Sequence, residues 1–171
     1  VLAGQDRLAF RDGLFRASGR IVHPEDSEEL LRLLHVCVLC SETEVTRQEG
    51  EYALRGSATE NALVSMAIGS GVNVLDLRAR YPLLTISHRS EQRNYMRTVH
   101  AAGEGSRLIA VKGSPNEVLD LCSTYLRNGV RLPLENGARS ALEAENERMA
   151  GDALRVLGVA YAYRDAGEAG D

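Results

Sequence analysis

Residues 108–119 read LIAVKGSPNEVL, and this stretch joins two kinds of secondary structure. Its first four residues are apolar, so they predict a strand that ends at Lys112 and Gly113. Ser114 then stands where the N-cap of a helix is expected, and Pro115 fits the first helical turn. The stretch therefore predicts a strand followed directly by a helix, with a lysine at the junction.

Further strand patterns flank this junction along the chain. Residues 95–102 and 107–111 are predicted to be two paired strands, and residues 82–87 are predicted to be extended. Residues 156–163 predict a final strand, and their apolar run indicates a central position in the sheet. Hairpin turns with glycine are predicted around residues 12–13, 49–50 and 128–129.

Helical patterns occur in separate groups between these strands. They begin at Pro24, after Ser57, near Leu75 and at about residue 137. Strands joined by hairpins, with helices grouped apart from them, predict an α+β fold rather than a doubly wound one. We therefore expect an antiparallel twisted β-sheet flanked by helices.

The length and charge of the chain limit the kinds of function that are open to it. Its 171 residues predict a single domain over 1–171, and the small, polar residues 164–171 predict a frayed end or a linker. The formal net charge of −4 argues against nucleic acid or an acidic membrane surface as partner. The N-terminus has no visible secretory signal and no initiator Met, so a fragment of a longer protein or a processed chain is expected.

The cysteines and histidines give no pattern that predicts a metal site. Cys37 and Cys40 form a C-x-x-C motif, but this pair lies in an apolar helical stretch and lacks a second pair. Buried small hydrophobic residues are the favoured interpretation of both thiols. Phosphate-binding, dinucleotide-binding and hydrolase motifs are also absent, so no catalytic residue is predicted in this chain.

Two charged residues are candidates for ligand contact. Lys112 is the only lysine among 20 basic residues, and it precedes a glycine at a strand-to-helix junction, where an anion or nucleotide could approach. Glu60 lies in the first turn of another predicted helix, three residues after Ser57. That spacing is also typical of a capping box, which would explain Glu60 without any ligand.

Four segments, read in order, resemble the nucleotide-binding domain of P-type ATPases, the phosphorylated cation pumps. GSATENAL at residues 56–63 is similar to the G-[ED]-[AP]-T-E-x-A-L segment of that family, and RNYMRTV at 93–99 is similar to its R-K-x-M-S-V strand. VKGSPNEVLDLC at 111–122 resembles the K-G-A-P-E segment. ALRVLGVA at 153–160 resembles a late strand of the family.

The resemblance implies a role for each matching position. Lys112 would line the adenosine pocket and reach toward the phosphates, and Gly113 would let the backbone pass close to the base. Glu60 would accept a hydrogen bond from the adenine amino group, and Thr59 would support the same wall. Arg155 would reach the phosphate chain.

One position departs from the pattern of the family. An aromatic residue that stacks on adenine usually stands four positions before the arginine that Arg93 matches here, and this chain has Arg89 at that place, next to His88. Guanidinium and imidazole groups are planar and can stack on a base, so Arg89 is predicted as the stacking residue. A pocket that has lost affinity, or one into which Tyr95 folds, is the other interpretation.

The resemblance implies a domain that holds ATP, accompanied by Mg²⁺, and passes its γ-phosphoryl group to an aspartate elsewhere. The chain has no D-K-T-G-T sequence, so the phosphorylation and actuator domains of the same polypeptide are the implied partners, on the cytoplasmic face of a membrane. The isolated domain would not complete turnover. A domain of the same fold that binds no nucleotide and acts in docking or regulation is the main alternative, and a stand-alone interaction domain is a third.

Overall fold

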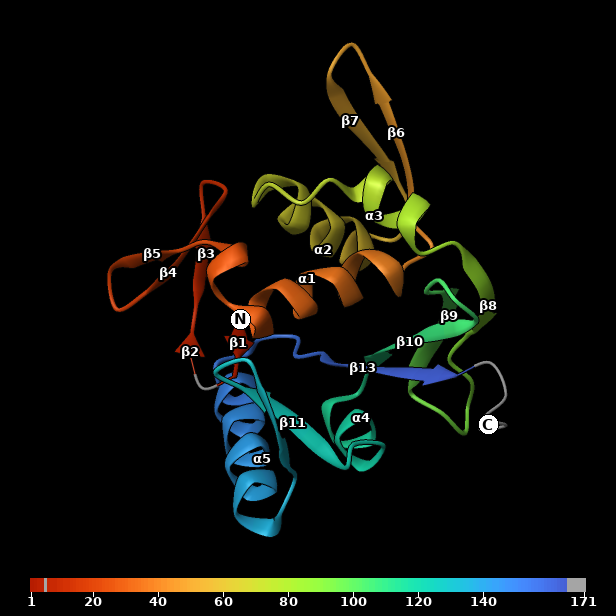
Figure 1. The fold of residues 1–171 in the computed structure, drawn as a ribbon. Helices are drawn as coiled ribbons and strands as arrows, with labels where there is room; N and C mark the ends of the chain where they lie inside the picture. The colour runs from red at the N-terminus through yellow and green to blue at the C-terminus, as the bar shows by residue number, and fades with distance from the viewer. Residues whose placement is uncertain (5, 166–171) are drawn as a thin grey trace.

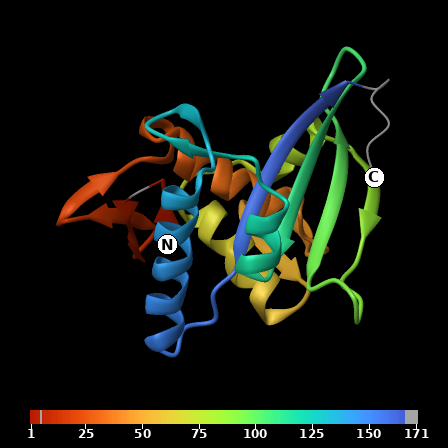
Figure 2. The same cartoon turned by 90° about the horizontal axis from the view of Figure 1, so that it is seen from below.

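The centre of the molecule is a four-stranded antiparallel sheet. In the computed structural model, which describes residues 1–4 and 6–165, the strand order is β13–β10–β9–β8. The strands are β8 (Leu83–Ser87), β9 (Tyr95–Ala101), β10 (Ser106–Gly113) and β13 (Gly158–Asp165). Figures 1 and 2 show helix α1 (Glu28–Leu39) across one face of this sheet. The predicted α+β fold, an antiparallel sheet flanked by helices, is thus confirmed.

Burial alternates along β9 with a period of two residues, and the buried residues attach the sheet to α1. Met96, Thr98 and His100 are buried, and the residues between them are only partly covered. The Leu39 carbonyl at the end of α1 accepts a hydrogen bond from the Thr98 hydroxyl at 3.5 Å. One face of β9 is therefore fixed against α1, as expected for a half-buried strand.

The last strand lies at an edge of this sheet, so the prediction of a central position is wrong. Among the described strands, β13 pairs with β10 alone, from Ser106 opposite Asp165 to Gly113 opposite Gly158. Its apolar sequence has another cause, because α1 and α4 (Pro115–Asp120) both contact it. A strand with cover on both faces has an apolar sequence whether or not strands lie on both sides.

The N-terminal quarter of the chain forms small hairpins and the most buried helix. The strands are β1 (Leu2–Ala3), β2 (Asp6–Arg7), β3 (Ala9–Arg11), β4 (Leu14–Ala17) and β5 (Arg20–Val22). The helix predicted from Pro24 begins instead with a short 3₁₀ turn, η1 (Pro24–Asp26). Ser27 then caps α1, because its hydroxyl accepts a hydrogen bond from the Leu30 amide at 3.3 Å.

The remaining predicted elements are present within a few residues of their expected bounds. They are β6 (Glu44–Gln48), β7 (Glu51–Arg55), α2 (Ala58–Gly69), α3 (Val74–Arg80), β11 (Thr124–Arg127), β12 (Val130–Pro133) and α5 (Asn136–Gly151). Asn128 and Gly129 join β11 to β12 with φ angles of 50° and 72°, the left-handed values that such a tight turn needs. β13 includes Arg164 and Asp165 of the predicted frayed end, and residues 166–171 lie outside the described residues.

The core lies between α1, α2 and α3 and the sheet. Leu30, Leu34 and Val38 of α1 are fully buried, together with Val64 of α2 and Val74 of α3. Each fully buried side chain of this kind contributes about 1.5–3 kcal/mol of transfer free energy. This core holds α2 against α1, and thereby sets the place of the residues at the N-terminus of α2.

No single helix among the described residues combines the length and the apolar composition needed to cross a membrane. The helices α2 and α3 meet that criterion only when taken together, and a bend of 102° separates them.

Candidate functional site

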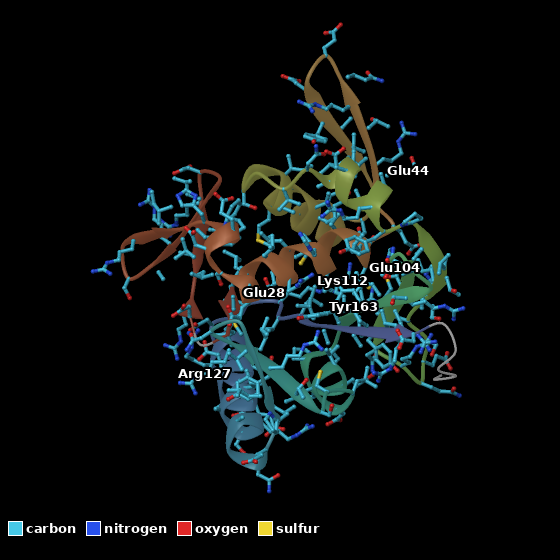
Figure 3. All side chains as sticks on the ribbon, viewed as in Figure 1. Glu28, Glu44, Glu104, Lys112, Arg127 and Tyr163 are labelled. Atoms are coloured by element: carbon cyan, nitrogen blue, oxygen red, sulfur yellow. The ribbon has the colours of Figure 1, made fainter. Side chains whose placement is uncertain are left out.

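Lys112 is a buried cation at the end of β10. Only 6% of the residue is exposed, and Figure 3 shows it between α1 and the sheet. Its ammonium donates a hydrogen bond to Glu60 Oε1 across 2.9 Å, which is also the distance of the ion pair. The two side chains come from positions 52 residues apart, and both are largely shielded from solvent, with 7% and 14% exposed. A lysine and a glutamate thus form an ion pair where the sheet meets α2.

Glu60 does not complete a capping box. The Ser57 hydroxyl does accept a hydrogen bond from the Glu60 amide at 3.3 Å, so the N-cap itself is confirmed. The carboxylate, however, binds Lys112 with one oxygen and accepts the Glu42 amide at 3.3 Å with the other. The side chain is therefore directed into the site between α2 and the sheet, and its local capping role is absent.

A network of uncharged and charged groups holds this end of α2. Thr43 Oγ1 donates to Asn61 Oδ1 at 3.1 Å, and Asn61 Nδ2 donates to the Gly56 carbonyl at 3.2 Å. A Cβ atom at Gly56 would come within 2.7 Å of Thr43 Oγ1, so this position has no room for a side chain. The Arg78 guanidinium donates to the Thr43 carbonyl at 2.7 Å and fastens the same turn. These contacts fix the backbone of the 56–63 segment and thereby orient Glu60.

The thiols of the C-x-x-C motif lie beside the lysine and form part of the core. Burial raises the pKa of the Cys37 thiol to about 12 and that of the Cys40 thiol to about 11, although the nearby Lys112 ammonium opposes both shifts. Both thiols are therefore neutral near pH 7. Within the described part of the chain, no three His, Cys, Asp or Glu residues are grouped as metal ligands. The prediction of buried hydrophobic cysteines is confirmed.

The loop between β8 and β9 borders this site. His88 Nδ1 lies 3.3 Å from Glu42 Oε2, and the Glu42 amide in turn contacts Glu60. Arg89 is exposed on the same loop. Arg93 donates from Nη2 to the His88 carbonyl at 2.7 Å, and its guanidinium lies 5.4 Å from the centre of the Tyr95 ring. The planar side chains of His88, Arg89 and Arg93 thus come from this loop, which holds the position predicted to stack on the base.

Gly113 is required by strand packing, which is a different reason from the predicted approach of a base. A Cβ atom there would overlap Asn94 O and the Cα and Cβ atoms of Tyr95. Glu117, at the start of α4, accepts hydrogen bonds from the Asn94 amide at 2.8 Å and from Asn94 Nδ2 at 2.6 Å. Ser114 occupies the N-cap position of α4 but makes no side-chain capping bond. The junction is thus fastened through Asn94.

The six predicted residues are not gathered into one cavity. Lys112 and Glu60 are in direct contact, and Thr59 precedes Glu60 in the first turn of α2. Arg155 is exposed in the segment between α5 and β13, and it lines a cavity of about 1290 Å³ to which none of the other five contributes. Gly158, three residues further on, pairs with Gly113, so Arg155 follows the same end of the sheet as Lys112.

Glu42 and Arg78 are site residues that the sequence analysis missed. Neither belongs to a motif: Glu42 contributes its backbone amide to Glu60, and the Arg78 side chain donates to the Thr43 carbonyl. Neither composition nor spacing could have indicated these two residues. Their contacts join α2, α3 and the turn after α1, which are separate in the sequence.

The α+β domain thus has an antiparallel sheet with a lysine–glutamate pair at the end of β10, and the family-like sequence segments follow one another in order along the chain. Residues 29–170 match the family described as P-type ATPase, cytoplasmic domain N. The chain belongs to this family.

Proteins similar to this chain include cation-transporting ATPases that are much longer than it. A sodium/potassium-transporting ATPase subunit alpha from Hydra vulgaris is 30% identical over 149 residues, which are 84% of this chain and 14% of that protein. A calcium-transporting ATPase from Bacillus subtilis (strain 168) is 26% identical over 91% of this chain and 18% of its own length. Calcium-transporting ATPase 1 from Lactococcus lactis is 33% identical over 77% of this chain and 14% of its own length. The chain thus spans less than a fifth of these relatives.

Proposed function

We propose that this domain binds ATP and positions its γ-phosphate for transfer to an aspartate in another domain of a P-type cation-transporting ATPase. The observation that carries the proposal is the contact between the Lys112 ammonium and the Glu60 carboxylate, 2.9 Å long and nearly excluded from water. A buried ion pair is an expensive way to stabilise a fold, because desolvation offsets much of its Coulombic gain. A ligand that binds to both charged groups would explain why the protein keeps this buried ion pair.

The chemistry of the two groups fits an adenine nucleotide. A carboxylate accepts hydrogen bonds, so Glu60 can receive one from the exocyclic amino group of adenine. An ammonium carries three donors, and the bond to Glu60 uses one of them. The other two donors of Lys112 can face the ribose or the phosphates. Low water access strengthens both contacts.

The rim supplies surfaces for the base and for the phosphates. Arg89 and His88 are exposed planar groups on the loop before β9, and either can stack on a purine. Arg155 follows the same end of the sheet and can pair with phosphate oxygens after movement of its exposed side chain. Gly113 keeps the end of β10 close to β9, and this fixes the position of the neighbouring Lys112 relative to the sheet.

The domain contributes binding and orientation, and the reacting groups lie elsewhere. We propose that the Mg²⁺ ion bound to ATP takes its protein ligands from the phosphorylation domain, because the described residues offer no group of three ligands. In-line phosphoryl transfer depends mainly on placement and charge neutralisation, so holding the nucleotide is a direct contribution to rate. The phosphorylation and actuator domains are the proposed partners, on the cytoplasmic face of a membrane.

Calorimetric titration with ATP tests this proposal. The wild-type chain should bind ATP, and Lys112→Met should weaken binding at least tenfold, because it keeps the apolar stem and removes the ammonium. Arg55→Ala, which removes an exposed cation from β7, serves as the matched control and should bind normally. Circular dichroism should confirm that each variant is folded.

Two results would contradict the proposal. If the folded wild-type chain gives no heat with ATP, the domain is better described as a docking or regulatory module of the same fold. If a folded Lys112→Met variant has reduced thermal stability but normal ATP affinity, Lys112 is a structural residue, and the nucleotide lies elsewhere.

A further inference from the structure

The register of the sheet separates the two planar side chains at the end of β8. Ile86 lies opposite Thr98 and Ser87 lies opposite Arg97, so successive residues of β8 alternate between the two faces of the sheet. Thr98 is buried, and Ile86 packs in one cluster with Val36 of α1. The face that carries Ile86 is therefore the face that α1 covers.

Lys112 lies on this same face. It stands opposite Met96 in the pairing of β10 with β9, and Met96 belongs to the cluster that includes Ile86. The Lys112 ammonium binds Glu60, at the N-terminus of α2. A base that contacts Glu60 therefore approaches the sheet from the side of α1, and a residue that stacks on this base has to lie on the same side.

His88 meets this condition. It follows Ile86 by two residues, so the alternation of β8 continues onto the same face. The contacts of its ring agree with this placement, because Nδ1 lies 3.3 Å from Glu42 Oε2, and the Glu42 amide donates to Glu60 Oε2 across 3.3 Å. Glu42 thus contacts both His88 and Glu60, and only this one residue separates the imidazole from the proposed anchor of the adenine amino group.

Arg89 does not meet the condition. Alternation along the strand places it on the opposite face of the sheet, with Ser87 and Arg97. The chain then turns back, because the backbones of Ser90 and Arg93 exchange two hydrogen bonds, at 3.0 and 3.2 Å. The Arg89 side chain would have to reach around this turn to contact a base bound at Glu60.

Neighbouring residues hold both the backbone and the ring of His88. Arg93 Nη2 donates to the His88 carbonyl at 2.7 Å, and Glu42 faces the Nδ1 edge of the ring. The side chain is 57% exposed, so a face of the imidazole is open to a ligand. A ring that already has a set orientation loses little conformational freedom when a ligand binds, and every base offers a π-face to an aromatic ring.

We infer that His88, oriented by Glu42, is the residue that stacks on the purine, and that Arg89 lies outside the base site. This inference rests on the proposed binding of ATP and names the aromatic contact of that same site. Histidine is among the side chains on which bases stack. The two contacts are compatible, because the imidazole takes the face of the base while Glu60 accepts a hydrogen bond at its edge.

Titration of variants with ATP tests the inference. His88→Ala should weaken ATP binding about tenfold, as expected for the loss of one base–aromatic stack. His88→Phe keeps a planar ring and should bind at least as tightly as the wild type. Arg89→Ala, at the adjacent position, is the matched control and should change the affinity less than about twofold. Inorganic tripolyphosphate, which lacks a base, should bind alike to the wild type and to His88→Ala, which separates stacking from charge.

NMR signals of the histidine rings give a second readout. The chain has four histidines, and the signals of His88 are those absent from the spectrum of His88→Phe. In the wild type, ATP should move the His88 ring signals upfield, because stacking places them in the ring current of adenine, and tripolyphosphate should not. In Glu42→Ala, this upfield shift should be smaller while the signals of the other three histidines keep their positions, as expected if Glu42 orients the ring without supporting the fold.

Three results would overturn the inference. No ATP binding by the folded wild-type chain would remove the proposed function and this inference together. ATP binding that Arg89→Ala weakens and His88→Ala leaves unchanged would assign the stack to Arg89. ATP binding that leaves the His88 ring signals unmoved would keep the proposed function and place the base away from His88.

Discussion

Lys112 and Glu60 form an ion pair on which the proposed function depends. Each is largely excluded from water, and each is the other's charged partner at 2.9 Å. Removing one member of such a pair leaves an uncompensated charge, which costs about 3–5 kcal/mol when the pair is fully buried. A variant that keeps a hydrogen-bonding group at the same place is therefore the sharper probe of function.

Glu60→Gln should reduce the preference of the domain for adenine. The amide can still accept a hydrogen bond from Lys112, but it is a weaker acceptor for the adenine amino group than a carboxylate. Affinity for ATP should fall about tenfold, or about 1.4 kcal/mol, while the weaker affinity for GTP should change little. Competition titrations with the two nucleotides measure this difference, and Glu44→Gln, on exposed β6, is the control. Equal losses for ATP and GTP would contradict contact between Glu60 and the base.

At the scale of elements, the junction between β10 and α4 depends on a close approach of two strands. The absence of a side chain at Gly113 lets β10 lie against Asn94 and Tyr95, and Glu117 then bonds Asn94 from α4. The loop before β9 and the helix after β10 are thus held by one contact. Any widening between the strands would displace Lys112 as well.

Gly113→Ala should destabilise the domain by about 3 kcal/mol, because its Cβ would overlap backbone atoms that cannot move without breaking the β9–β10 pairing. Gly137→Ala is the matched control: nothing lies within 4 Å of the added atom, and alanine favours the helix α5. Urea unfolding of both variants measures the free energies. A Gly113→Ala variant as stable as Gly137→Ala would show that the strands tolerate a wider spacing.

At the scale of the whole molecule, an ion pair joins the N-terminal hairpin to helix α5. Arg7 of β2 donates to Glu145 of α5 at 2.7 Å, across 138 positions. Hydrogen bonds from Arg148 and from Arg7 lower the pKa of the Glu145 carboxyl from 4.5 to about 2. A depressed carboxyl pKa means that the folded state favours the ionised form, so the bonds of Glu145, first to Arg148 of the same helix and then to Arg7, stabilise the fold above pH 4.5 and are lost toward pH 2.

The attachment of α5 should therefore weaken between about pH 4.5 and pH 2. Wild-type protein should lose more thermal stability over this interval than Glu145→Gln, which cannot ionise and lacks the stabilising charge at every pH. Melting curves recorded at several pH values measure the difference, and the two proteins should converge at the acidic end. Parallel curves for the two proteins would show that the ion pair does not contribute to stability.

The elements that depend on neighbouring residues could be predicted from the sequence. The Asn128–Gly129 turn, the Ser57 cap and the alternation in β9 each follow from residues within one element. The order of family-like segments also indicated the family, which the match over residues 29–170 confirms. Backbone preferences and side-chain periodicity depend on residues that are adjacent in sequence, so they can be predicted without the tertiary structure.

Relations between distant elements were decided only by the tertiary structure. Glu60 has the spacing of a capping residue, yet its carboxylate pairs with a lysine 52 positions away. The apolar run near the C-terminus indicated a central strand, yet β13 is an edge strand whose faces are covered by helices. The same hydrophobic pattern results from cover by helices or by strands, and the same acidic residue can cap a helix or pair with a cation. Which of these possible partners a residue contacts depends on which one the packed core brings close to it. The packing of the core in turn depends on all the elements together.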